Sequence, residues 1–214
     1  MQQVDIKLSQ DHDLGKRSNA LLFKRSLEAG LTDYAHFAIP CNTFNTARFP
    51  KLRTKVFPNG LPDLSARNRA VLADDNKLFG HSLMLVETCC KMGMAVSVEN
   101  PAASVMWHHP KWLRLARKFD VQFTDLDYCQ YGMGYRKRTR LATYMPGQSA
   151  SFLGGLARRC PGVSSTHQHT WVLSGWYPLR HMDHPMLVTK KGSATYPQEL
   201  VEAWTRLVVE ALIR

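Results

Sequence analysis

The chain has 214 residues, 44% of them hydrophobic, which is enough for one sizeable core or one core with a small lobe. Its 28 basic and 17 acidic side chains give a formal net charge of +11, which favours a polyanionic or acidic partner. No apolar run reaches transmembrane length, the N-terminus lacks a signal-peptide pattern, and the five cysteines form no paired framework. We therefore expect an intracellular protein, cytoplasmic or nuclear and not secreted, with no membrane partner.

Short apolar runs alternate with helical patterns along the first two thirds of the chain. The expected elements are a strand at 4–6, a helix over 18–29, a strand over 32–40, a helix over 64–91 in two pieces, a strand over 94–98, a helix over 103–119, a strand over 121–126, and a strand or hairpin arm over 135–143. This order predicts an α/β fold with a largely parallel sheet over residues 1–145. A small lobe over 146–191 and a closing helix over 192–214 complete the expected organisation.

Three of the expected strands end in residues that carry chemistry. Pro40-Cys41 ends the first of them, Glu99-Asn100-Pro101 the second, and a turn containing Tyr131-Gly132 follows the third. Because the carboxyl ends of parallel strands open on one rim, these residues are expected to lie close together. A buried cysteine that caps a strand is the alternative for Cys41, and a carboxylate held by local backbone N–H groups is the alternative for Glu99.

Basic charge gathers beside these candidate residues. Residues 41–80 carry seven basic and three acidic side chains, and residues 101–145 carry eight and three, whereas residues 1–40 are balanced at five each. The stretch from 42 to 60 shows no helical or alternating period, so we expect a long loop that faces nucleic acid or is disordered. The side chains expected to contact DNA are Arg48, Lys51, Arg53, Arg136 and Arg138.

The ordered motifs resemble those of DNA cytosine-5 methyltransferases, most closely divergent phage-like or mobile-element-like members. The resemblance rests on Pro40-Cys41-Asn42-Thr43-Phe44, Glu99-Asn100-Pro101 and Tyr131-Gly132 with Tyr135-Arg136-Lys137, and it returns at Tyr196-Pro197, which opens the last helix. It implies a Rossmann-like methyltransferase fold and an S-adenosylmethionine-dependent enzyme that acts on DNA. The region 146–191 would then be a reduced target-recognition region.

The resemblance also implies roles for single residues. The Cys41 thiolate would add to C6 of a flipped cytosine, so that C5 accepts the methyl group of S-adenosylmethionine. Glu99 would support protonation at N3, and Lys137 would assist at O2. Asp5 would hold the ribose hydroxyls of the cofactor, Asp13 its adenine amino group, and Pro40 would lie beside it.

Two departures from the family pattern bear on the cofactor and the base. No glycine-rich strand-turn precedes Val4, so we expect an N-terminally incomplete catalytic core that binds S-adenosylmethionine weakly or not at all. The usual Gln-x-Arg-x-Arg series is replaced by Tyr135, Lys137 and Thr139. The alternatives are a catalytically inactive nucleic-acid-binding protein on the same fold, and a different Rossmann-like enzyme in which Cys41 and Glu99 do not converge.

The region 146–191 holds the remaining candidate ligands. Its cysteine and histidines are Cys160, His167, His169, His181 and His184. Because their spacing matches no strong zinc signature, we predict no metal site and interpret them as surface histidines and a buried cysteine, with a zinc site as the alternative.

Overall fold

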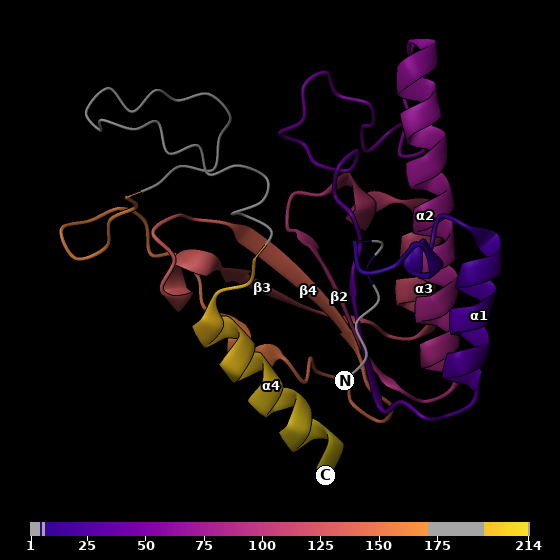
Figure 1. Ribbon diagram of the computed structural model, residues 1–214. Helices are drawn as coiled ribbons and strands as arrows, with labels where there is room; N and C mark the ends of the chain where they lie inside the picture. Colours follow the sequence, from indigo (N-terminus) through magenta and orange to yellow (C-terminus); the bar gives the residue numbers. More distant parts are fainter. Residues whose placement is uncertain (1–4, 6, 171–194, 214) are drawn as a thin grey trace.

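The computed structural model describes residues 5, 7–170 and 195–213. Its sheet has four strands, namely β1 (Tyr34–Ala38), β2 (Ala95–Pro101), β3 (Gln122–Asp127) and β4 (Arg138–Tyr144), in the order β1-β2-β4-β3. The helices are α1 (Arg17–Glu28), α2 (Ala66–Lys91), α3 (Pro110–Lys118) and α4 (Gln198–Ile213). Helices α2 and α3 cover one face of the sheet, with α1 against α2, and α4 covers the other face (Figure 1).

The expectation of a largely parallel sheet is corrected by the pairing of the strands. Strands β1 and β2 are parallel, whereas β4 runs antiparallel to both of its neighbours, β2 and β3. Since β2 and β3 both oppose β4, they point in the same direction as each other and as β1. The carboxyl ends of β1, β2 and β3 therefore still open on one edge of the sheet, which we call the rim.

Alternation along β2 builds two different cores. Val96 and Val98 face α2 and α3 in an apolar cluster with Phe79 and Trp112. Their neighbours Ser97 and Glu99 have the opposite orientation and lie on the α4 face, where Leu141, Leu200, Trp204 and three tyrosines form a second cluster. The α4 face therefore receives the polar side chains of β2.

The helices differ from the expected ones at a glycine and at a proline. Helix α2 is continuous through Gly80, because the packing of Phe79, Leu83 and Val86 outweighs the cost of about 1 kcal/mol for a helical glycine. The helix expected over 103–119 is instead a 3-10 turn, Val105–His108, followed by α3. Pro110 begins α3, where its missing N–H costs nothing, and the His109 side chain accepts a hydrogen bond from the Lys111 N–H as the N-cap.

The two ends of the chain can be compared with the strand expected at 4–6 and the closing helix expected over 192–214. Asp5 lies in a turn, with its carbonyl accepting from Leu8 and Ser9, and the sheet contains no described residue before Tyr34. The other residues of the strand expected at 4–6 lie outside the described residues. Helix α4 agrees with the expected closing helix, and among the described helices we find none with the length and apolarity needed to cross a bilayer.

Candidate functional site

The rim joins the two motifs that contain Cys41 and Glu99. Residue 38 pairs with Glu99 across the parallel β1–β2 ladder. The fully buried Asn100 donates from Nδ2 to the Ile39 carbonyl at 2.6 Å, one residue before Pro40. This bond fixes the backbone that leads into Pro40-Cys41 relative to β2, so the nucleophile candidate and the acid candidate belong to neighbouring strand ends. Cys41 itself is half-buried.

Glu99 and Lys137 form a buried ion pair at this rim. Lys137 Nζ lies 3.8 Å from Glu99 Oε1, too far for a hydrogen bond, and Glu99 is only 8% exposed. Lys137 is positioned by Tyr128, whose ring lies 4.6 Å below the ammonium and whose hydroxyl accepts a hydrogen bond from Nζ at 3.3 Å. Glu99 Oε1 is buried and has no hydrogen-bond partner among the described residues. An unpaired acceptor of this kind costs free energy unless something else binds it.

The surroundings of Glu99 favour its protonated form. Burial raises the pKa of Glu99, and the Lys137 ammonium offsets only part of that rise. Burial and the nearby Glu99 carboxylate also raise the pKa values of Tyr128 and Tyr196, so both phenols keep their protons. The site therefore combines a carboxyl group that gives up its proton less readily than a solvated one with a cation beside it.

A hydrogen-bonded layer continues from this pair beneath α4. His36 Nδ1 lies 2.9 Å from Ser97 Oγ and His36 Nε2 lies 3.0 Å from the Tyr196 hydroxyl. Burial lowers the pKa of His36 to about 4, so this histidine is neutral. Trp204 Nε1 donates to the Tyr34 hydroxyl at 2.9 Å, which ties α4 to β1. Of these residues the sequence had singled out only Tyr196; the signal for Tyr34, His36 and Ser97 was their polar alternation within apolar strands.

We expect Asn100→Ala to loosen the connection between the two motifs. Loss of the bond to the Ile39 carbonyl should lower the free energy of unfolding by about 1–2 kcal/mol. It should also change the rate at which iodoacetamide alkylates Cys41, measured by peptide mass spectrometry. Asn45→Ala is the matched control, since among the described residues the Asn45 side chain accepts only a local bond from the Ala47 N–H, and its backbone bond to Cys41 survives the change. An unchanged stability and alkylation rate in Asn100→Ala would contradict this account of the rim.

The loop from 42 to 60 divides the residues predicted to contact DNA. Lys51 is exposed and Arg48 half-exposed, as a DNA contact requires. Arg53 is different, because it is 3% exposed. Its guanidinium donates to Thr43 Oγ1, Asn76 Oδ1 and the Pro58 carbonyl and lies over the Phe44 ring. The structure therefore corrects the DNA-facing role predicted for Arg53, which instead holds the loop against α2.

Arg136 and Arg138 are exposed but paired with aspartates of β3. Arg136 Nε lies 3.0 Å from Asp127 Oδ1, and Arg138 Nη2 lies 3.5 Å from Asp125 Oδ2. Part of the positive charge predicted for this strand is thus compensated within the protein. Both guanidinium groups keep further N–H donors that can reach a phosphate.

Two of the residues predicted to hold S-adenosylmethionine, Asp5 and Asp13, each accept a local backbone hydrogen bond. The Asp5 carboxylate accepts from the Lys7 N–H at 2.9 Å and the Asp13 carboxylate accepts from the Gly15 N–H at 2.9 Å, so each closes a local turn. Neither aspartate belongs to the sheet, and only Pro40 lies at the rim. In the described part of the chain, no glycine-rich strand-turn accompanies them.

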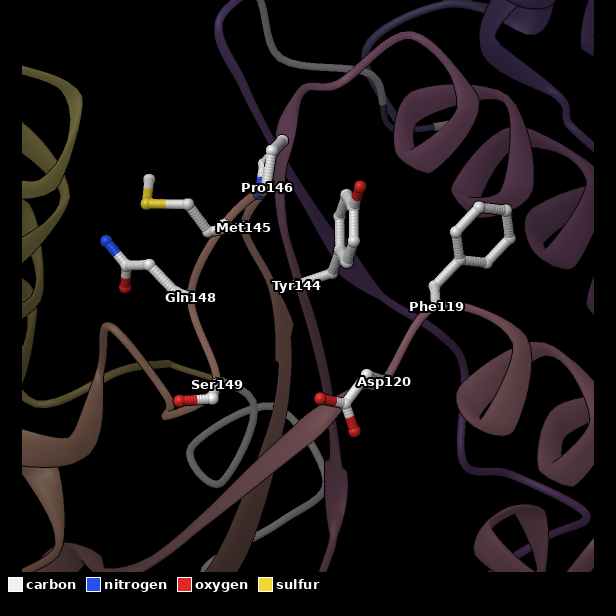
Figure 2. A pocket seen from close by; sticks show the side chains of 8 residues that line it. Phe119, Asp120, Tyr144, Met145, Pro146, Gln148 and Ser149 are labelled. Carbon is white, nitrogen blue, oxygen red and sulfur yellow. The ribbon is translucent and has the colours of Figure 1, made fainter.

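A hollow with a volume of about 340 Å³ lies at the edge of the sheet opposite the rim (Figure 2). Phe119 and Asp120, which precede β3, line one side of it. The other lining residues, 144–149, are the last residue of β4 and the segment that follows. Phe119 and Tyr144 meet there edge to face, with ring centroids 5.7 Å apart. This hollow is open and shares no residue with the rim, so it adds nothing to the site of Cys41 and Glu99.

Comparison of the chain with protein-family models, curated proteins and solved structures gave no significant match. The function therefore has to be argued from the rim.

Proposed function

We propose that this protein binds DNA and adds the Cys41 thiolate to C6 of an unstacked cytosine, the base-activating step of cytosine-5 methylation. The observation that carries the proposal is the buried Glu99 carboxyl, whose Oε1 has no hydrogen-bond partner among the described residues and lies 3.8 Å from the Lys137 ammonium. A protonated carboxyl and a cation side by side match the N3 and O2 atoms of cytosine, which accept a proton and a hydrogen bond.

The chemistry needs only residues of the rim and water. The Cys41 sulfur forms a bond to C6 while the C5–C6 double bond opens, and N3 takes the proton of Glu99 as negative charge develops in the ring. C5 then behaves as an enamine carbon and accepts a proton from water. The hydroxide left by that step takes either C5 hydrogen as a proton, and return of the N3 proton to Glu99 with expulsion of the thiolate regenerates cytosine.

The strand arrangement supports a methyltransferase-like form of the α/β fold. Rossmann-like methyltransferase sheets carry a reversed strand inserted next to the edge strand, and β4 occupies that position between β2 and β3. Strand ends β1 and β2 then supply the cysteine and the glutamate. The β3–β4 connection supplies the lysine.

Exposed basic side chains near the rim support DNA as the partner. Lys51 and Arg48 lie on the loop that follows Cys41, and Arg136 flanks Lys137. Phosphate contacts of this kind would hold the backbone while the base leaves the stack. Binding should weaken as salt rises.

Exchange of the hydrogen at cytosine C5 tests the proposal without any methyl donor. Full-length protein is incubated with a duplex that carries cytosine labelled with tritium at C5, and the release of tritium to water is measured. We expect catalysed release, and a fall of at least about 1,000-fold in Cys41→Ser. Cys90→Ala, which alters a thiol buried on the α2 face, is the control that should keep the activity.

Absence of release above the Cys41→Ser background, in a protein that binds the duplex, would overturn the proposal. It would favour the second candidate, a nucleic-acid-binding protein without catalysis. The observation that favours this candidate is the local turns in which Asp5 and Asp13 are engaged, because they leave the predicted methyl-donor residues without a site.

A further inference from the structure

Four candidate metal ligands from two distant parts of the sequence converge beside the end of β3. The ligand atoms of Cys129, Cys160, His167 and His169 all lie within 4.8 Å of one another. Cys129 belongs to the 3-10 turn Tyr128–Tyr131 that follows β3, and the other three come from the segment after residue 157. All four side chains are half-buried, so the group is shielded but reachable.

The spacing of the ligand atoms suits a tetrahedral ion. Cys160 Sγ lies 3.4 Å from His167 Nε2 and 3.5 Å from His169 Nε2, and the two Nε2 atoms are 3.1 Å apart. A tetrahedral zinc ion with Zn–S of about 2.3 Å and Zn–N of about 2.0–2.1 Å separates sulfur from nitrogen by about 3.6 Å and two nitrogens by about 3.3 Å. The observed distances agree with these values within a few tenths of an ångström.

The ligand set and the groups behind it also fit zinc. Two thiolates with two imidazoles form one of the usual closed structural zinc sites. The Cys160 N–H donates to Asp127 Oδ2 at 2.9 Å, and the Gly162 N–H lies 3.4 Å from Cys160 Sγ, so the loop is already shaped around this sulfur. Such supporting bonds are typical of metal sites.

We propose that Cys129, Cys160, His167 and His169 bind one structural Zn²⁺. The spacing after Cys160 predicted no metal, because the fourth ligand, Cys129, precedes that segment by 31 positions in the sequence and only the fold brings it there. The ion ties the segment 158–169 to the β3–β4 connection, which also carries Tyr128 and Lys137. This inference does not depend on the proposed cytosine chemistry.

Metal analysis of the full-length protein tests the proposal. We expect one equivalent of zinc per chain after purification with zinc and without chelator. The metal should be lost in the variant with Cys160→Ser and retained in His108→Gln, which alters an exposed histidine outside the group. Replacement of zinc by Co²⁺ should give the intense visible bands of a tetrahedral site with a thiolate charge-transfer band. In Cys129→His the metal should stay, with the charge-transfer band reduced to about half.

A readout on the unaltered chain keeps the test decisive if a variant does not fold. Zinc should slow the alkylation of Cys129 and Cys160, mapped by peptide mass spectrometry, and a chelator should restore it. Removal of the metal should lower the melting temperature by roughly 10 °C. The proposal would be overturned if a folded chain given excess metal bound less than one equivalent of zinc, or if zinc did not change the alkylation rate. A Cys129–Cys160 disulfide that persists in the presence of a reductant would also overturn it.

Discussion

Glu99→Gln is expected to stabilise the fold while it removes the proposed cytosine chemistry. Glutamine has the same shape but no ionisable group, so the cost of burying a carboxylate whose Oε1 has no hydrogen-bond partner disappears. It also has no proton to give to N3, so C5 exchange should fall by about 100-fold or more. If Glu99 only supported the fold, its replacement by glutamine would lower the free energy of unfolding.

The stability that Glu99→Gln gains over the unaltered protein should increase with pH. Burial raises the pKa of Glu99 in the folded state, so folding is opposed by its ionisation as pH rises above its usual pKa of about 4.3. The advantage of the glutamine variant in the free energy of unfolding should be near zero below that pH and reach about 1 kcal/mol at neutral and higher pH. Urea denaturation of both proteins across this range measures it.

Glu87→Gln is the matched control for the pH series. Glu87 is exposed enough to be solvated, and the Lys118 and Lys91 ammonium groups lower its pKa. Its replacement should therefore reduce stability slightly, with the opposite pH trend. A stability loss in Glu99→Gln at neutral pH would contradict the assignment of Glu99 as a strained functional acid.

Asp127→Asn is expected to be the most destabilising single change near the rim. The fully buried carboxylate accepts from Arg136, Arg159 and the Cys160 N–H at 2.9–3.1 Å. An amide cannot replace these charge-assisted bonds, so the free energy of unfolding should fall by about 2–3 kcal/mol at pH 7. Urea denaturation measures the change, and Asp74→Asn, which breaks an exposed pair with Lys77, should cost almost nothing.

This loss should also depend on pH. Burial opposes ionisation of Asp127, but the Cys160 N–H and Arg136 outweigh it and lower its pKa. The stabilisation is therefore complete above the usual pKa of about 3.9 and disappears as pH falls through the lowered value. The difference between Asp127→Asn and the unaltered protein should shrink in acid, and a difference that stays constant down to pH 2 would contradict the ion-pair explanation.

Much of the fold could be predicted from local patterns, but the antiparallel direction of β4 was left open between a strand and a hairpin arm. The apolar runs at 32–40, 94–98 and 121–126 each contain a strand, and 135–143 overlaps β4. Direction is a property of pairing, which periodicity does not record. A usable signal did exist, because the ten residues between Asp127 and Arg138 are too few for a crossover helix and require an antiparallel return.

Side-chain environments at the site were less accessible from the sequence. Arg53 was predicted to face solvent because it lies in a basic loop, yet Thr43, Pro58 and Asn76 satisfy its guanidinium inside the protein. Its burial depends on a contact with α2 that no spacing encodes. The shared rim placed Glu99 near the turn that follows β3, but its ion pair with Lys137 was not predicted. His36 and Tyr196 meet across 160 positions and could not be paired without the fold.

The position of β4 between β2 and β3 also limits how early the sheet can form during synthesis. Strands β1 and β2 leave the ribosome well before β4, so β2 waits with an unpaired edge until residues 138–144 arrive. Trp204 and Tyr196 of the last segment must then close the α4 face. Nascent chains that lack Tyr196 and Trp204 should therefore be aggregation-prone, with the α4 face of the sheet uncovered.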